Sequence, residues 1–265
     1  MKYTKGIVAI AFLLLTMGVT GINAFGFLGF GGTSWKEEVL LHDGTKIIVE
    51  RSVDRGGRHE IGQHPPIKEQ SLTFTLPSSK QTVTWKVEYC QEVGYADLSP
   101  IMLGIINETP YLVTHPVACL AYNKWKRPNP PYIVFRYTNK AWQQIELKEL
   151  PLDLKVPNLI ISSPDSEVER ANTRFMSAEQ VRNLNSDLRQ PEYKTILREP
   201  VEPGRHEGSG VNCKEMIREE GGWLGIDWFS DQPSYEKCME MCVRKKVKPK
   251  DCPCDRLFNK NDKEK

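Results

Sequence analysis

An excess of charge of either sign is absent from this chain. Without residues 1–24, which contain two lysines and no acids, 34 lysines and arginines are balanced by 34 aspartates and glutamates. Bulk electrostatics therefore favour neither nucleic acid nor a membrane surface as the partner. We expect no nucleic-acid partner, and contact with a membrane only through the N-terminal segment.

Catalytic and cofactor motifs are also lacking. His59 and His64 flank Glu60, but they are five residues apart with Gly62 between them. The zinc-protease motif needs two histidines one helical turn apart, so this stretch is interpreted as a surface loop. The sequence thus predicts a protein that is not an enzyme, with no metal and no cofactor. The alternative is a hydrolase with a site dispersed in sequence, for which Asp54, His59 and Glu60 are the first suspects.

No charged residue occurs between Lys5 and Lys36. Lys2 and Lys5 precede an apolar run that ends in small residues at Ala24, which is typical of a secretory signal. A run of ~20 apolar residues also suffices for a membrane anchor. Residues 1–24 are predicted to be a signal peptide or an N-terminal anchor. The rest of the chain is expected outside the cytoplasm, either periplasmic or membrane-anchored.

Helix-periodic runs are scarce, whereas turn residues are frequent, with 18 prolines and 19 glycines. Asp43-Gly44 lies between two apolar runs, and this dipeptide is a strong signal of a β-hairpin. Similar patterns predict hairpins over 71–89, 101–113 and 132–147. The predicted fold is mainly β, an antiparallel sandwich or barrel-like domain over residues 34–165, with one or two short helices.

Beyond the hairpins the pattern changes. Residues 158–162 are expected to add a strand. Residues 166–198 are predicted to be helical and extended, and in them Ser177 and Gln180 form a capping box that starts a helix. Residues 199–212 contain two prolines and three glycines among charged residues, which predicts a linker.

Seven cysteines in a chain that is expected to be exported predict disulfides. Cys90 and Cys119 lie in the predicted β domain and are expected to form a pair. Because seven is odd, one thiol must be left over. Cys213 is our choice for that thiol, either free or bridging two copies into a homodimer.

The last four cysteines define a small module over residues 213–254. Residues four apart on a helix share a face, as do residues two apart on a strand, so two bridges are expected to join a helix to a strand. The spacing resembles the cysteine-stabilised α/β motif of small secreted defensins and toxins, which implies a stapled scaffold. Zinc ligation is the alternative, and an oxidising compartment favours disulfides. The four are Cys238, Cys242, Cys252 and Cys254.

Two stretches in the C-terminal part of the chain carry further predictions. Residues 255–265 are predicted to be a disordered basic tail, and the basic residues from Arg244 onward are interpreted as solvated. Residues 221–229 contain three aromatic side chains, which are interpreted as the core of the module.

One stretch combines aromatic rings, cations and a proline run, and it supplies the candidate binding residues Tyr122, Trp125, Arg127 and Tyr132. Prolines reduce the entropy that a loop loses on binding, and Trp, Tyr and Arg dominate interface hot spots. The alternative is structural, with Trp125 packed over the end of the sheet.

The segments WKEEVLLHDGTKIIVERS, AYNKWKRPNPPY and QPEYKTILREP resemble those of exported bacterial proteins without assigned function, over residues 35–200. This resemblance implies a cell-envelope origin and no particular activity. With the candidate binding loop, it leads to the expectation of an exported envelope protein of the binding type, whose partner is another protein. An immunity or inhibitor protein that acts on a secreted partner is one version.

Overall fold

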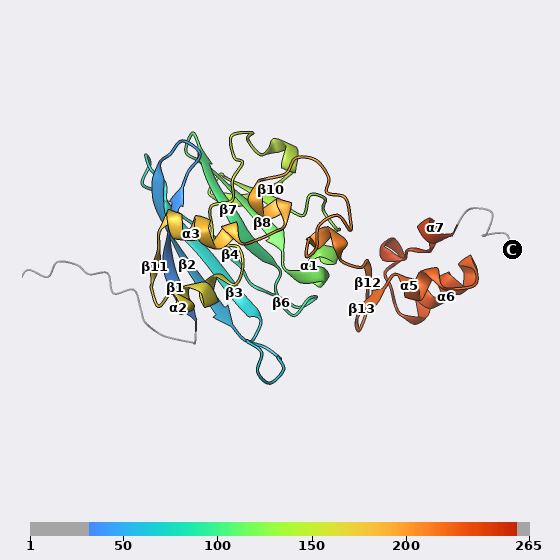
Figure 1. Ribbon diagram of the computed structural model, residues 1–265. Helices are drawn as coiled ribbons and strands as arrows, with labels where there is room; N and C mark the ends of the chain where they lie inside the picture. Colours follow the sequence, from blue (N-terminus) through green and yellow to red (C-terminus); the bar gives the residue numbers. More distant parts are fainter. Residues whose placement is uncertain (1–31, 259–265) are drawn as a thin grey trace, which may run out of the picture. The chain divides into compact units, whose positions relative to one another are not determined.

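The β-hairpins form two antiparallel sheets in the computed structural model, which describes residues 32–258 (Figure 1). The predicted signal peptide or anchor lies outside the described residues, as do residues 259–265 of the predicted tail. Among the described helices, none has the length and apolar character needed to cross a membrane.

The first sheet has five strands in the order β11-β1-β2-β3-β4. Its first hairpin turns at Asp43-Gly44 as predicted, and Gly44 adopts a φ of 85°, a conformation that favours glycine. The short strand β11 joins the sheet edge in parallel to β1. The five strands are β1 (Thr33–Leu40), β2 (Lys46–Arg55), β3 (Ile67–Thr75), β4 (Thr82–Val87) and β11 (Phe175–Met176).

The second sheet has four strands in the order β10-β9-β8-β7. Its outer hairpins turn at Asn107-Glu108 and Asn139-Lys140, and all four residues have positive φ, as in the primed turns that match the twist of β-strands. A small separate ladder pairs β5 (Tyr89–Cys90) with β6 (Tyr95–Ala96). The strands of the second sheet are β7 (Leu98–Ile106), β8 (Thr109–Pro116), β9 (Ile133–Thr138) and β10 (Ala141–Ile145).

Both sheets contribute to one hydrophobic core, which confirms the predicted sandwich. Leu72 and Trp85 from the first sheet lie in the same cluster as Leu103 and Leu112 from the second. Neither sheet closes into a barrel, because each has two edge strands. Alternation of apolar side chains along β1–β4 thus buries one face of the first sheet, as the sequence pattern indicates.

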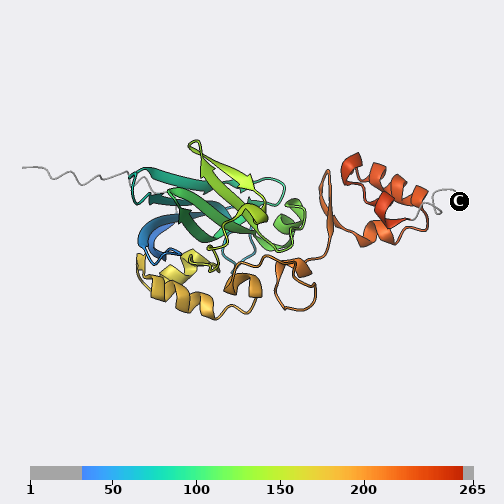
Figure 2. The same cartoon turned by 90° about the horizontal axis from the view of Figure 1, so that it is seen from above.

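Seven short α-helices are present in the described residues, more than the one or two that were expected. The capping box is confirmed: Ser177 Oγ accepts from Gln180 N and the Gln180 side chain accepts from Ser177 N. Helices α2 and α3 lie against β1 (Figures 1 and 2). The helices are α1 (Ala118–Lys124), α2 (Pro164–Arg170), α3 (Ala178–Ser186), α4 (Pro191–Lys194), α5 (Asp227–Ser230), α6 (Tyr235–Arg244) and α7 (Cys254–Leu257).

The strand predicted over residues 158–162 is wrong, because this segment is irregular although it is buried. Side chains replace a strand ladder as its hydrogen-bond partners. Asn158 Nδ2 donates to the carbonyls of Leu40 and Leu103, and Glu37 Oε2 accepts from Ile160 N at 3.1 Å. The apolar pattern therefore indicates burial correctly, but tertiary contacts decide the conformation.

Residues 199–212, the predicted linker, are anchored to the β domain at both ends. Val201 and Val211 are buried in a cluster with Tyr122. The Asn129 side chain pairs with the backbone of Val201 in both directions, at 2.9 and 2.7 Å. The segment is thus packed on the β domain, and it contains the short 3-10 helix Gly210–Asn212.

The C-terminal module has a hairpin, β12 (Met216–Glu219) and β13 (Gly222–Gly225), followed by α5, α6 and α7. Disulfides join Cys238 to Cys254 and Cys242 to Cys252, so the two predicted bridges are present. The strand expected at the last two cysteines is wrong: Cys252 follows a 3-10 helix, Pro249–Asp251, and Cys254 begins α7. Helix α7 also includes residues that were expected to belong to a disordered tail.

The predicted pairing of the other three cysteines is wrong. Cys119 is bonded to Cys213 across 94 residues of sequence, and Cys90 is the free thiol. Cys213 is therefore not available to join two copies into a homodimer. The packing of residues 199–212 against Tyr122 brings Cys213 to helix α1, and sequence spacing carries no sign of this approach.

Candidate functional site: a basic groove beside helix α1

The end of helix α1 is held by a Schellman motif, in which backbone amides beyond the helix cap its last carbonyls. Arg127 N donates to the Tyr122 carbonyl at 2.9 Å, and Lys126 N donates to the Asn123 carbonyl at 3.0 Å. Lys126 and Arg127 both have left-handed backbone conformations, with φ values of 65° and 54°. The chain therefore turns sharply directly after the helix.

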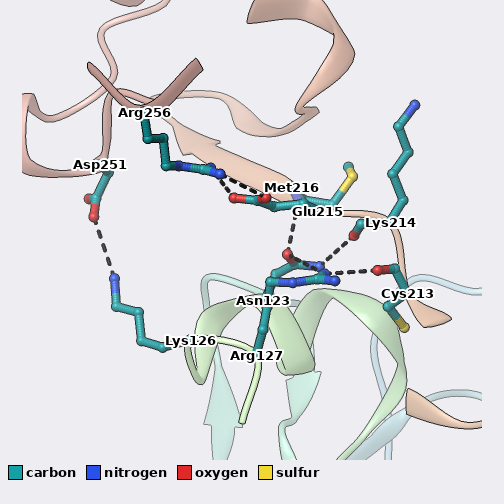
Figure 3. Close-up of polar contacts among 9 residues, drawn as sticks. All are labelled: Asn123, Lys126, Arg127, Cys213, Lys214, Glu215, Met216, Asp251 and Arg256. Carbon is teal, nitrogen blue, oxygen red and sulfur yellow. Dashed lines mark hydrogen bonds and ion pairs between the residues drawn. The ribbon is translucent and has the colours of Figure 1, made fainter. Parts of the chain in front are cut away.

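Two side chains of this turn bind the segment that leads into the C-terminal module (Figure 3). Asn123 Nδ2 donates to the Lys214 carbonyl at 3.0 Å, and its Oδ1 accepts from Met216 N at 2.9 Å. Arg127 Nη1 donates to the Cys213 carbonyl at 2.8 Å, and its guanidinium lies 5.1 Å from the centre of the Tyr122 ring. Together with the disulfide Cys119–Cys213, these contacts fix the start of the module on α1.

Two further contacts join the module to the β domain, and another pair lies within the module. Lys126 Nζ lies 3.4 Å from Asp251 Oδ1 (Figure 3). Trp223 Nε1 donates to the Glu92 carbonyl at 2.8 Å, next to strand β5. Within the module, Arg256 pairs with Glu215 through its two terminal guanidinium nitrogens, Nη1 and Nη2.

These contacts surround a groove of about 450 Å³, which we call the basic groove. Seven lysine and arginine side chains line it, against three carboxylates. The cations are Lys124, Lys126, Arg127, Arg218, Lys248, Lys250 and Arg256, and the acids are Glu92, Glu215 and Asp251.

Part of this charge is neutralised locally. Burial opposes the charge of Lys124, but its contacts with Asp97 and Cys90 together outweigh burial and raise the pKa of Lys124. Lys126 and Arg256 have the carboxylate partners given above. Among the described residues, no carboxylate pairs with the other four cations, which are Arg127, Arg218, Lys248 and Lys250.

The groove also offers an aromatic surface. The Arg218 guanidinium lies 5.6 Å from the centre of the Trp223 ring, and its Nη1 donates to the Gly222 carbonyl at 2.7 Å. A stacked guanidinium is held in one orientation, so it can receive a carboxylate with little loss of entropy. The arrangement thus suits an anionic ligand that also carries apolar groups.

Of the four candidate binding residues, the structure places only Arg127 in this groove. Tyr122 and Tyr132 are buried, so their expected display on a surface loop is wrong. The hydroxyl of Tyr132 donates to the Glu192 carbonyl inside the protein. Trp125 is half-buried, packs against the sandwich core, and donates from Nε1 to Asp97 at 2.9 Å.

Four groove residues were not among the predicted binding residues: Arg218, Trp223, Lys248 and Lys250. The excess of cations near the C-terminus was the available signal, but it was interpreted as a solvated tail. Of the three aromatic rings over 221–229, only Phe229 is in the core of the module, while Trp228 is 50% exposed. These rings had no distinguishing local pattern.

The residues suspected for a hydrolase are not assembled into a shared site. Asp54 is near the end of β2, and His59 and Glu60 are exposed in the loop that follows. His59 Nδ1 contacts the Gly57 carbonyl at 3.0 Å.

Within the described part of the chain, one cluster has metal-ligating side chains in reach of one another, Cys242, Cys252 and Cys254. All three are half-cystines in the structure, which favours the disulfide interpretation over the zinc alternative.

Comparison of this chain with protein-family models, with curated proteins and with solved structures finds no match.

Proposed function

We propose that this is an exported binding protein of the cell envelope, and that its basic groove receives an acidic segment of a partner protein. The observation that carries the proposal is the meeting of two surfaces in one groove. The turn after α1 supplies Arg127, and the disulfide-bonded module supplies Arg218, Lys248 and Lys250. An immunity or inhibitor protein that neutralises a secreted partner is the version that we favour.

Charge complementarity gives the specificity of such a contact and accelerates association. The whole chain is nearly neutral, so the local excess of cations in the groove is not a consequence of composition. A partner segment rich in Asp and Glu with an aromatic or aliphatic side chain would pair with the free cations and pack on Trp223. Three internal disulfides support an oxidising compartment.

Binding of a fluorescein-labelled hexaglutamate peptide tests the groove directly. The double variant Arg218→Glu, Lys250→Glu should weaken binding by about tenfold, since each exposed pair contributes up to ~1 kcal/mol. The double variant Lys36→Glu, Lys68→Glu is the matched control, because it makes the same charge change at exposed positions on β1 and β3. If the groove variant and the control variant weakened peptide binding equally, the groove would not be the binding site. Affinity for a sulfated oligosaccharide equal to that for the peptide would also contradict the proposal.

The partner itself can be sought with a photocrosslinking amino acid at Trp223. In a chain that is otherwise wild type, the crosslinker should yield a specific crosslinked protein from the exported fraction. The same crosslinker in the double variant should not yield that product. Export is tested separately with a reporter that is active only outside the cytoplasm, fused after residue 60. Reporter activity is expected, and an inactive fusion would contradict export.

A further inference from the structure

A second cavity, of about 600 Å³, lies between the β1–β2 turn, strand β7, residues 153–158 and the start of α3. It shares no lining residue with the basic groove. Its volume is within the range of ~300–1,000 Å³ that is usual for small-molecule sites.

The walls of this cavity are held by hydrogen bonds. Asn158 Oδ1 accepts from Leu103 N at 2.9 Å, and its Nδ2 donates to Leu40 O at 3.0 Å and Leu103 O at 2.8 Å. Ile196 N donates to the Lys155 carbonyl at 2.7 Å. At α3, Ala178 N donates to Glu38 Oε2 at 3.2 Å. These bonds pre-form the cavity, which reduces the cost of binding.

The lining is mainly apolar. Leu41, Met102, Leu103 and Leu154 line it and are buried. Val156 also lines the cavity, yet it is 65% exposed. An aliphatic ligand would cover this side chain and remove apolar surface from water. Because both amide hydrogens of Asn158 are already donated, the wall that it forms offers no free donor to a polar ligand.

The charged residues of the lining have an excess of cations. Lys155 and Arg182 are exposed, as is His42, and Asp153 is the one carboxylate in the lining. Among the described residues, neither Lys155 nor Arg182 has a carboxylate partner. An anionic head group beside an aliphatic tail would therefore complement this site.

We propose that this cavity binds a single-chain aliphatic carboxylate, a free fatty acid, with the tail along Leu41, Met102 and Leu154 and the carboxylate near Lys155 and Arg182. The site is separate from the basic groove, so it does not rest on the proposed protein partner. It adds a small-molecule ligand to the β domain.

The probes are octanoate, decanoate and dodecanoate, titrated into the purified full-length protein by calorimetry. Each methylene that enters the cavity should tighten binding by about fourfold, the equivalent of ~0.8 kcal/mol. Decyltrimethylammonium has the same tail and the opposite charge, so it should bind more weakly than decanoate. Phospholipid vesicles should not compete, since the proposal is a free single chain.

Single substitutions test the contacts to the aliphatic tail and to the carboxylate separately. Val156→Ser removes apolar lining at an exposed position and should weaken decanoate without lowering thermal stability. Arg182→Gln should weaken it by two- to fivefold, and Asp153→Asn should tighten it by a similar factor. The groove variant Lys250→Glu should bind decanoate as wild type does. Affinity that is independent of chain length, or equal for the cationic amphiphile, would overturn the proposal. Competition by vesicles would overturn it in favour of a membrane lipid.

Discussion

The β sandwich and the C-terminal module are stabilised in different ways. The sandwich buries a large core between two sheets, in which Leu72, Leu103 and Leu112 are fully inaccessible. The module's core cluster has seven buried residues, and three of them are half-cystines. A small chain buries too little of its surface to be stable by packing alone, so cross-links replace part of the missing core. Each part is therefore expected to be destabilised by a different kind of substitution.

The largest effect is expected for Glu37→Gln, in the sandwich alone. Glu37 is fully buried, and its Oε1 accepts from Arg51 Nη1 at 2.9 Å and from Trp35 Nε1 at 2.7 Å. A neutral side chain would leave the Arg51 charge buried without its partner, which typically costs about 3–5 kcal/mol of the free energy of unfolding. Urea titration measures this loss. Glu38→Gln, next to it on β1, removes only a partly exposed pair with Lys46 and should cost far less. Similar losses for the two would contradict the assignment.

The second prediction concerns the place where sandwich and module meet. Trp125 packs against the sandwich core and its indole is bonded to Asp97, so Trp125→Ala should lower the free energy of unfolding by about 3 kcal/mol. Thermal unfolding followed by circular dichroism measures the change. An unchanged melting temperature would show instead that the ring is available for a partner, as the binding interpretation of the sequence requires.

The third prediction concerns a change that should destabilise the module alone. Removing the bridge with Cys242→Ser and Cys252→Ser opens a loop whose closure contributes about 2.7 kcal/mol in the chain-entropy model. Limited proteolysis should then cut within residues 216–258, while the sandwich keeps its thermal transition. If the sandwich lost its thermal transition together with the protease resistance of the module, the two cores would unfold together. Stoichiometric zinc in the exported protein would contradict the disulfide assignment.

The smallest effect is a pH dependence that should be confined to the sandwich. His115 Nε2 is buried without a hydrogen-bond partner among the described residues, and burial lowers the pKa of His115 to about 4. In the unfolded chain the imidazole titrates near 6.5, so the unfolded state binds the proton first as the pH falls. Stability contributed by the neutral ring is complete above pH ~6.5 and is lost toward pH 4.

Between pH 6 and pH 4.5 the sandwich should therefore lose about 2 kcal/mol, at ~1.4 kcal/mol per pH unit. Urea titrations of the wild type and of His115→Gln at both pH values measure the difference, because the variant cannot take up this proton. The module contains no histidine, so hydrogen exchange of its amides should show no matching change in this window. If His115→Gln loses the same free energy of unfolding between the two pH values, other titratable groups cause the loss.

Local patterns predicted most of the elements. Asp43-Gly44 marks the first hairpin, and Ser177 with Gln180 marks the start of α3, because turn and cap residues act on backbone groups only two or three positions away. Helix α6 begins in the same way after Ser234, whose side chain accepts from Lys237 N. Each of these signals is complete within a few residues.

The candidate site was predictable only in part. Arg127 was identified from its own loop, but Arg218, Trp223 and Lys250 had no local pattern that linked them to it. Residues 158–162 show the same limit, since their apolar pattern indicated burial and their hydrogen bonds came from Asn158 and Glu37 instead of a neighbouring strand.

The hairpins, the capped helices and the two closely spaced bridges of the module follow from local sequence, since each depends on contacts between near neighbours in the chain. The bond between Cys119 and Cys213, which leaves Cys90 free, and the groove between the turn after α1 and the module depend instead on the folded chain as a whole. Such contacts join residues about a hundred positions apart, and the energy that selects them comes from the packing of the whole chain, which no short pattern records.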